Sequence, residues 1–239
     1  MKKIKGKLIV IDGTDGSGKA TQVDLLMKRL KGDGYIVKTV DFPEYYKNFF
    51  GGFIANCLKD QSYNWVNIHP QIASIVYAAD RWESKDQIEE WLNKGYIVIA
   101  NRYVSANQIH QGGKIHDAKK RKEFLRWLDD MEYRVFGIPR PDVVFYLEVP
   151  IKFTQKLMLE RDKNNSREYL GNKKDVHEND EKFLENSRKS ALKLINELNN
   201  FIKVSCVAGT KMREREDIHN YVYVESIKLL PKIKKTKTK

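Results

Sequence analysis

Short runs of apolar residues alternate along the chain with segments in which apolar residues recur every three or four positions. Continuous runs rich in Val, Ile and Leu are typical of buried strands, and they occupy residues 7–12, 35–42, 96–100, 143–149 and 203–207. Apolar residues at i, i+3, i+4 and i+7 are typical of amphipathic helices. They predict a first helix that ends at Asp33-Gly34 and further helices near residues 69–93, 118–136, 151–161, 178–201 and 214–230.

The order of these segments indicates an α/β fold. Strands that alternate with helices form a parallel sheet with helices on both faces, so we expect three layers around a central sheet of about five strands. Neither a repeat nor a linker rich in Pro, Ser or Gly interrupts residues 1–231, which we interpret as one domain followed by a basic tail at 232–239. In the long helix, the residues expected to face the core are Ile72, Ile75, Val76 and Ala79.

Composition excludes several classes of protein. Of the 239 residues, 41% are hydrophobic, which is enough for a folded core. The apolar runs stay well below the ~20 residues needed to cross a bilayer, and the Lys-rich start lacks the apolar segment of a signal peptide. Cys57 and Cys206 are too few for a disulfide framework. We therefore expect a cytoplasmic protein with two reduced thiols and no membrane partner.

The net charge of +12 is concentrated at the two ends. Four lysines precede residue 8 and five follow residue 231, without an acidic residue in either segment, which leaves a net charge of +3 for residues 8–231. Solvated terminal segments explain this pattern without a specific nucleic-acid partner. Weak attachment to polyanions stays open.

A glycine-rich segment separates the first strand from the first helix. Residues 13–19 fit G-x-x-x-x-G-K, the phosphate-binding loop. In such a loop, backbone N–H groups and the start of the following helix surround phosphate oxygens, and the lysine reaches the β- and γ-phosphates. The order of strand, loop and helix predicts a nucleotide site. Its expected ATP-binding residues are Gly13, Thr14, Asp15, Gly16, Ser17, Gly18, Lys19, Ala20 and Thr21.

One position departs from the motif. Ala20 follows the lysine, where a serine or threonine hydroxyl normally contacts Mg²⁺, and Thr21 comes one place later. One place corresponds to a turn of about 100° around a helix, so Thr21 is a weak candidate for the metal contact. A carboxylate beside bound phosphates is unfavourable unless it pairs with a cation or a substrate hydroxyl, which makes Asp15 a candidate site residue.

Phosphate-binding loops serve kinases, GTPase switches and motor ATPases alike. A GTPase requires a D-x-x-G segment on a later strand, yet the match at residues 15–18 lies inside the loop itself. Residues 172–175 spell N-K-x-D, the guanine-reading motif, but they follow a polar stretch instead of a strand. We interpret that match as chance, so the sequence does not support a GTPase.

Residues 98–107 carry the decisive signal. They read VIANRYVSAN and place an arginine, an aromatic residue and amides just past the end of a strand, where open α/β sheets bind ligands. Here the chain resembles the thymidylate kinase family of P-loop nucleoside monophosphate kinases, which carries a D-R-Y/H motif at this place. The resemblance continues, in the family's order, at Phe42-Pro43-Glu44-Tyr45, Asp80-Arg81, Pro141-Asp142 and Asp175-Val176-His177-Glu178.

The resemblance implies roles at the phosphate and sugar of an acceptor nucleotide. Arg102, the arginine of the motif, would hold the acceptor phosphate. Phe42 and Tyr45 would close over the phosphate and sugar, and Asp15 would contact the 3′-hydroxyl or the arginine. His110 falls where some members place a tyrosine that crowds a 2′-hydroxyl, although an ordinary helical histidine fits this position about as well.

The resemblance also implies a group of residues that read the base. Tyr77 would stack on it, Arg81 would donate to the carbonyl O4, and Asn107 would read the N3 edge. The acceptor implied by the family is dTMP. A kinase for dUMP or another pyrimidine monophosphate stays open as an alternative.

Metal and lid residues follow the family less closely. Asn101 replaces the aspartate of the family motif, a carboxylate that can bind Mg²⁺ through water. The basic segment 161–177 looks like the family's lid over ATP, and a solvated surface loop is the other interpretation. The catalytic residues implied by the resemblance are Lys19, Arg102, Asp15, Arg161 and Arg167.

The expected chemistry needs few further groups. The phosphate of a nucleoside monophosphate is already a nucleophile, so catalysis requires alignment and cations instead of a general base. Sequence and resemblance together predict a thymidylate kinase that phosphorylates dTMP with ATP and Mg²⁺ and works as a homodimer. Ala20 and Asn101 leave open a nucleotide-binding homologue with reduced activity.

Overall fold

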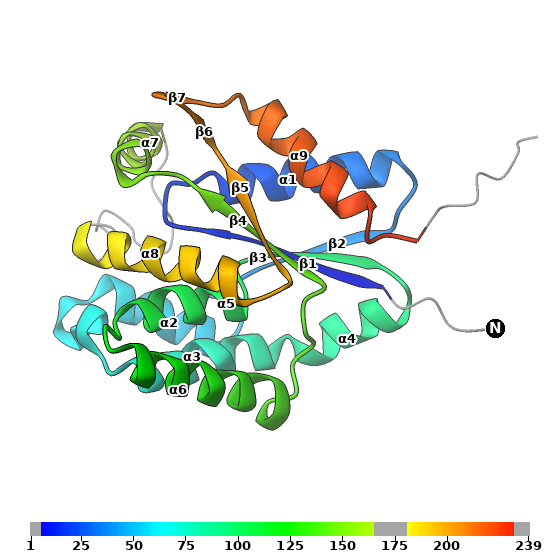
Figure 1. Ribbon diagram of the computed structural model, residues 1–239. Helices are drawn as coiled ribbons and strands as arrows, with labels where there is room; N and C mark the ends of the chain where they lie inside the picture. The colour runs from blue at the N-terminus through cyan, green and yellow to red at the C-terminus, as the bar shows by residue number, and fades with distance from the viewer. Residues whose placement is uncertain (1–5, 165–180, 232–239) are drawn as a thin grey trace, which may run out of the picture.

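The computed structural model describes residues 6–164 and 181–231, which form a five-stranded sheet covered by helices (Figure 1). Neighbouring strands are parallel throughout, in the order β2-β3-β1-β4-β5. The strands are β1 (Lys7–Gly13), β2 (Val37–Asp41), β3 (Ile97–Asn101), β4 (Val143–Glu148) and β5 (Phe201–Ser205). The strands predicted from the apolar runs are therefore confirmed, with small shifts at their ends.

Helices cover both faces of the sheet, as the alternation of segments predicted. In Figure 1, α1 (Lys19–Gly32) and α9 (Arg215–Ile227) lie above the sheet. The helices below it are α2 (Phe49–Lys59), α3 (Pro70–Glu83), α4 (Lys85–Asn93), α5 (Val104–Ala106), α6 (Ala118–Asp129) and α8 (Glu181–Glu197). The remaining elements near the sheet are α7 (Ile151–Asn164), which follows β4, and the antiparallel pair β6 (Val207–Ala208) and β7 (Lys211–Met212), which follows β5.

Alternate residues of β1 supply two separate cores, because successive side chains of a strand point to opposite faces. The core below the sheet includes Leu8, Val10, Ile88, Val104 and Leu194. The core above it includes Ile9, Ile11, Leu26, Leu30 and Val222. All ten side chains are at most 1% exposed. The strand that leads into the glycine-rich loop is therefore packed tightly on both sides.

Two predicted helices are divided. The segment 69–93 forms α3 and α4, because the chain turns at Ser84, whose hydroxyl donates to Glu44. The segment 118–136 begins as α6, with Asp117 accepting from the backbone N–H of Lys120 at 2.7 Å, and continues as a π-helical turn, η4 (Asp130–Val135). A second π-helical turn, η3 (Asn107–Gln111), follows α5.

Helix α2 was not predicted, because two glycines weaken its helical signal. Asn48 caps it by accepting from the N–H of Gly51 at 2.6 Å. A Cβ on Gly51 would lie 2.2 Å from the carbonyl oxygen of Glu44, so this glycine permits a close approach of two backbone segments. Two short 3₁₀ turns, η1 (Gln61–Tyr63) and η2 (Trp65–Asn67), lead from α2 to α3.

The prediction for the inner face of α3 is wrong at two positions. Ile72 and Ile75 are 56% and 44% exposed, whereas Ala73 is fully buried. The charged residues Asp80 and Arg81 are also buried, and both form hydrogen bonds inside the protein. Apolar spacing cannot identify a buried face that consists of small and charged residues.

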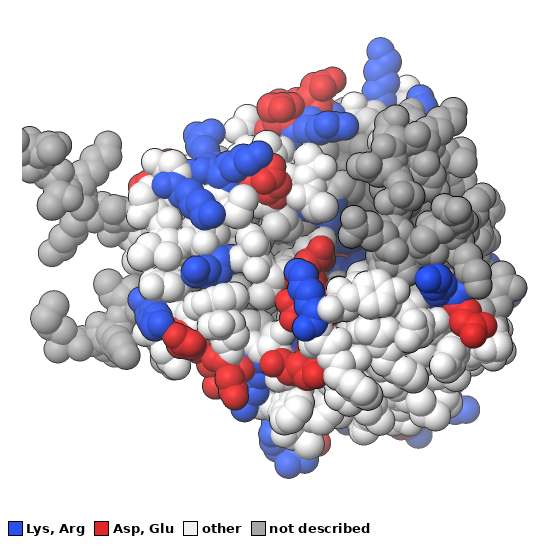
Figure 2. Space-filling model, turned by 180° about the vertical axis from the view of Figure 1, so that it is seen from behind, with Lys and Arg blue, Asp and Glu red and all other residues white. Residues whose placement is uncertain are grey.

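Charged side chains of both signs are interspersed on the face shown in Figure 2. Lys7, counted above with the basic N-terminal segment, belongs to β1, and its Nζ lies 2.6 Å from Oδ1 of Asp142. The other basic terminal residues lie outside the described residues. Among the helices that the structure describes, none combines the length and the apolar character that a membrane span requires.

The carboxyl ends of β1, β2 and β3 meet at one edge of the sheet. Asp41 at the end of β2 is paired in register with Asn101 at the end of β3, and Ile11 of β1 is paired with Asn101 from the other side. The glycine-rich loop leaves this edge from β1, and Arg102 leaves it from β3. Residues far apart in the sequence are thereby brought to one place.

Candidate active site

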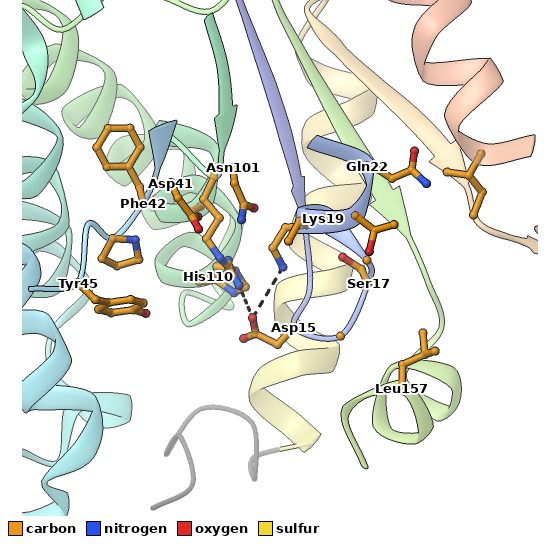
Figure 3. Close-up of a pocket in the computed structure, with 18 of the residues that line it drawn as sticks. Asp15, Ser17, Lys19, Gln22, Asp41, Phe42, Tyr45, Asn101, His110 and Leu157 are labelled. Atoms are coloured by element: carbon orange, nitrogen blue, oxygen red, sulfur yellow. Dashed lines mark hydrogen bonds and ion pairs between the residues drawn. The ribbon is translucent and has the colours of Figure 1, made fainter. Parts of the chain in front are cut away.

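The glycine-rich segment forms a loop between β1 and α1 (Figure 3). Gly16 and Gly18 have φ angles of 77° and 87°, in the left-handed region that glycine adopts without strain. A Cβ on Gly16 would lie 2.7 Å from the carbonyl oxygen of Thr154 in α7. The loop needs glycine here both for its turn and for its contact with α7.

Lys19 begins α1 and bonds back to the loop. Its Nζ donates to the carbonyl oxygens of Gly13 and Thr14 at 3.1 and 3.0 Å and lies 3.7 Å from Oδ1 of Asp15 (Figure 3). Burial, together with the positive charge of Arg102, lowers the pKa of Lys19 to about 8. The ammonium group is therefore still charged at neutral pH, yet it is poorly solvated and well suited to attract a phosphate.

Arg102 extends from the end of β3 toward this loop. Its φ of 64° lies in the left-handed region, a strained conformation for a residue with a side chain. The guanidinium donates to Asp15 and to Nε2 of His110, the latter at 2.7 Å, and lies 3.9 Å from Oδ1 of Asp12. Burial by itself would lower the pKa of Arg102, but the carboxylates of Asp15 and Asp12 raise it by more. The guanidinium is therefore permanently cationic.

A cavity of about 760 Å³ lies in front of the loop. This volume is within the range of small-molecule sites. The sequence-predicted residues that line the cavity are Asp15, Gly16, Ser17, Gly18, Lys19, Ala20, Thr21, Phe42, Tyr45, Tyr77, Arg81, Arg102, Asn107 and His110. The cavity thus contains all the predicted acceptor residues and the predicted ATP residues except Gly13 and Thr14, which do not line it.

The amide of Asn107 has a defined orientation on the cavity wall. Its Nδ2 donates to the carbonyl oxygen of Ser74 at 3.1 Å and to Oε1 of Glu132 at 2.8 Å. Both neighbours are acceptors, so the nitrogen must face them. Oδ1 makes no hydrogen bond with the described part of the chain and is left to accept one from a ligand.

Arg81 lies beside Asn107 on the same wall. Its Nε and Nη2 donate to the two carboxylate oxygens of Glu132 at 2.7 and 2.6 Å. Burial disfavours the charged form, but the charge and hydrogen bonds of Glu132 raise the pKa of Arg81. Arg81 therefore stays cationic, its charge is balanced by the Glu132 carboxylate, and further N–H groups of the guanidinium are left for a ligand.

The glycine-rich loop, the segment around Arg102 and the cavity residues up to Arg215 all lie within the part of the chain that matches a known family. A family model described as thymidylate kinase matches residues 11–215. The chain belongs to the thymidylate kinase family. The enzymes of this family use ATP, and the prediction of the family and its P-loop α/β fold is confirmed.

Individual relatives agree with this membership. The chain is 34% identical to the thymidylate kinase of Plasmodium falciparum over 64% of this chain and 66% of that protein. It is 29% identical to the thymidylate kinase of Thermosipho africanus over 85% of this chain and 90% of that protein. The solved thymidylate kinase of Candida albicans shares the fold, with a TM-score of 0.66 and 24% identity across 94% of this chain and 93% of that one.

The three aromatic residues that the family resemblance assigns to the acceptor occupy the cavity wall. Phe42 is 2% exposed, and its ring centroid lies 5.8 Å from that of Tyr103 in the core. The hydroxyl of Tyr77 accepts from Nε1 of Trp65 at 2.9 Å, which fixes the direction of its ring. Tyr45 is partly buried on the same wall. Buried residues behind the wall, Tyr103 and Trp65, therefore hold the rings of Phe42 and Tyr77 in place.

The predicted lid falls largely outside the described residues. Helix α7 continues to Asn164, beyond the predicted end at residue 161, so the backbone of Arg161 is helical. The side chain of Arg161 and the whole of Arg167 lie outside the described part of the chain. Their catalytic roles stay predictions.

Two buried carboxylates of the site were missed from the sequence. Asp12, the penultimate residue of β1, accepts from the N–H of Gly13 at 2.8 Å and from the hydroxyl of Ser105 at 2.5 Å, which ties the loop to the segment after β3. An acidic residue at the end of an apolar run was a usable signal for it. Glu132 had no such signal, because an acidic residue in an amphipathic helix is normally exposed.

A further part of the cavity wall comes from the C-terminal region. The segment between β7 and α9 contributes Arg213 and Glu214 to the wall, and the first residue of α9, Arg215, adds to it. Gln22 of α1 fixes this segment by donating to the carbonyl oxygen of Arg215 at 3.0 Å. No local motif marks these residues, so they could not be predicted from the sequence.

Proposed function

We propose that the protein transfers the γ-phosphate of ATP to dTMP and forms dTDP and ADP. The fixed amide of Asn107 carries this proposal, because its Oδ1 accepts a hydrogen bond and offers none. N3 of thymine or uracil bears a hydrogen, whereas N3 of cytosine does not. We assign the remaining N–H groups of the Arg81 guanidinium to the carbonyl O4 of the base. The pair therefore favours a thymine or uracil base.

ATP occupies the side of the cavity formed by the glycine-rich loop. Its phosphates take the place of the carbonyl oxygens of Gly13 and Thr14 as partners of Lys19. Backbone N–H groups at the start of α1 add their partial positive charge. The wall formed by Arg213 and Glu214 is the proposed contact for the nucleoside of ATP.

Arg102 holds the acceptor phosphate between the two nucleotides. The acceptor phosphate is itself the nucleophile, so the protein contributes alignment and positive charge. The negative charge of Asp15 is compatible with phosphates nearby, because Asp15 pairs with Arg102 and lies 3.7 Å from Nζ of Lys19. Arg161 and Arg167 are proposed as further cations at the transferred phosphoryl group.

The oxygen atoms of the side chains around the cavity are compatible with a Mg²⁺ ion bound to the ATP phosphates. Oδ1 of Asn101 is a buried acceptor without a hydrogen-bond partner in the described structure, which suits a contact with metal-bound water. Thr21 lines the same cavity. Among the described residues, no cluster of three or more His, Cys, Asp or Glu side chains could hold a metal, so ATP phosphates would supply most ligands. When bound, Mg²⁺ neutralises charge on the transferred phosphoryl group.

A homodimer is the proposed assembly. Ile72, Ile75 and Trp82 share one face of α3, because they are three and seven positions apart, and they are 56%, 44% and 52% exposed. Phe49 on the neighbouring helix α2 is 75% exposed. Large apolar side chains grouped on adjacent helices are typical of an interaction surface. Self-association of this face agrees with the pairing implied by the family resemblance.

The cytoplasm is the proposed location. Cys57 and Cys206 are free and buried. Burial raises the pKa of their thiols to about 11 and about 12. Such thiols are protonated and unreactive at neutral pH, as expected for structural cysteines in a reducing compartment.

A coupled assay of ADP release over a panel of monophosphates tests the activity. We expect turnover with dTMP, less or none with dCMP and dGMP, and none with the Lys19→Ala variant. Turnover with dUMP above that with dTMP would replace the proposed acceptor. A protein that binds ATP and dTMP but turns over none of the panel would contradict the kinase activity.

A further inference from the structure

His110 makes two hydrogen bonds that decide which ring nitrogen carries the proton. Its Nε2 lies 2.7 Å from Nη1 of Arg102, and its Nδ1 lies 3.0 Å from Oγ of Ser187. A guanidinium only donates hydrogen bonds, so Nε2 is the acceptor and carries no proton. The neutral ring therefore holds its proton on Nδ1 and donates it to Ser187, whose hydroxyl donates in turn to the carbonyl of Phe183 at 2.8 Å.

The surroundings of His110 hold the ring in this orientation. The residue is 9% exposed, and its ring stacks on that of Phe183, with centroids 5.8 Å apart and an angle of 15° between the planes. Ser187 is fully buried, and helix α8, which carries it, packs against η3, which carries His110. A half-turn of the ring about its Cβ–Cγ bond would keep the stack but put carbon atoms in the places of both nitrogens and break both hydrogen bonds. Nε2 is thus presented to Arg102 in a fixed direction.

Arg102 is held from its other side as well. Its Nη2 donates to Asp15 in the glycine-rich loop, so the guanidinium lies between a carboxylate and an imidazole (Figure 3 shows Asp15 and His110). An arginine side chain loses considerable rotamer freedom when a ligand fixes it. A group that is fixed beforehand avoids this cost when the ligand binds and reacts. His110 therefore orients Arg102 before the acceptor phosphate arrives.

We propose that His110 is a positioning residue for Arg102 and acts on phosphoryl transfer instead of on sugar selection. This inference rests on the proposed function, in which Arg102 holds the acceptor phosphate. The family resemblance assigned the position of His110 to a residue that crowds a 2′-hydroxyl, but both ring nitrogens have protein partners. Loss of the Nε2 acceptor should slow transfer to every acceptor alike.

Two replacements separate the functions of the two ring nitrogens. The side-chain amide of glutamine reaches the position of Nε2, whereas that of asparagine reaches only the position of Nδ1. We expect His110→Asn to lower kcat about tenfold for dTMP, for dUMP and for the ribonucleotide of thymine, because a hydrogen bond to a charged group is lost. The KM for ATP should stay unchanged. His110→Gln restores an acceptor for Arg102 and should recover most of the lost kcat.

Two serines on α8 provide a matched pair of further variants. Ser187→Ala removes the partner of Nδ1 and should lower kcat by about threefold for all acceptors. Ser190→Ala removes a hydroxyl that donates to the carbonyl oxygen of Gln108 at 3.1 Å, away from the ring, and should leave kcat unchanged. Melting temperatures of all variants identify any that fails to fold.

Equal losses in the Gln and Asn variants would overturn the proposal, and so would a change confined to the ratio between dTMP and its ribonucleotide. Nitrogen-15 NMR of the His110 ring in the wild-type protein, without nucleotide, is an independent test. It does not depend on whether the variants fold. We expect a protonated Nδ1 and an unprotonated Nε2, and the opposite tautomer would also overturn the proposal. Failure of the proposed function gives a different result, in which no acceptor is phosphorylated although the NMR tautomer is the expected one.

Discussion

Arg81 and Glu132 form a two-fold hydrogen-bonded ion pair in the interior, with side chains that are 2% and 0% exposed. The same carboxylate accepts from Nδ2 of Asn107 at 2.8 Å. One buried acidic residue thereby fixes both side chains that are proposed to read the base. Base recognition and the stability of the fold are coupled at this point.

Arg81→Ala should destabilise the fold strongly, because it leaves Glu132 buried without a compensating charge. Removal of one partner of a buried ion pair typically costs about 3–5 kcal/mol. Urea unfolding of the variant measures this loss. The matched control is Arg134→Ala, which breaks an exposed pair with Asp130 on the same turn as Glu132 and should leave the unfolding midpoint almost unchanged. Equal midpoints for the two variants would contradict the importance of the buried pair.

Asn107→Ala should impair the choice of base more than the transfer of phosphate. A base edge that loses its hydrogen-bond partner costs about 1–3 kcal/mol, so kcat/KM for dTMP should fall about tenfold while the KM for ATP changes little. Steady-state kinetics with dTMP, dUMP and dCMP measure this selectivity. Arg102→Ala is the contrasting variant and should lower kcat for every acceptor. If Asn107→Ala raises the KM for ATP and leaves acceptor preference unchanged, the acceptor pocket lies elsewhere.

ATP binding should weaken as the pH rises above about 8, since Lys19 then loses its positive charge in the free protein. Burial lowers the pKa of this group to about 8, and a phosphate in the loop favours the protonated form. Above that pH, binding must therefore take up a proton. Calorimetric titration with a non-hydrolysable ATP analogue, in two buffers of different ionisation enthalpy, measures affinity and proton uptake together.

Two variants of Lys19 control this experiment. Lys19→Arg keeps its charge over the whole pH range, so its proton uptake above pH ~8 should disappear. Lys19→Ala should lower kcat by more than tenfold, a barrier change above ~1.4 kcal/mol, without lowering the melting temperature. Undiminished proton uptake in the Lys19→Arg variant would assign the titration to another group.

Charged residues on the exposed face of α3 should dissociate the proposed dimer. Ile72→Glu combined with Ile75→Glu places two carboxylates where apolar side chains are expected to meet their copies, and light scattering after gel filtration should then report a monomer. Ile36→Glu is the matched control, because Ile36 is 57% exposed and precedes β2, whereas the chain leads to α2 from the other end of that strand. A wild-type protein that is monomeric at micromolar concentration would disprove this assembly.

The sequence by itself determined the sheet and the phosphate-binding loop. The three central strands, β1, β3 and β4, are short apolar runs that are almost wholly buried. Such a run can be recognised without its neighbours. The edge strands β2 and β5 are only partly buried, but their apolar residues still mark them. The glycine-rich loop is also contiguous, and Gly16 and Gly18 adopt the left-handed conformations that its turn requires. Local geometry decides these features, so local patterns predict them.

Only the tertiary structure decided which polar groups meet and in what orientation. Arg81 pairs with a residue 51 positions away, Arg102 with one 87 positions away, and His110 with one 77 positions away. No periodicity in a single sequence records such pairs. The exposed Ile72 and Ile75 show the same limit, because the buried face of α3 is occupied by small residues and by charged groups whose partners lie on other elements. Hydrogen bonding between distant segments makes burial of these charges possible, and that compensation exists only in the folded chain.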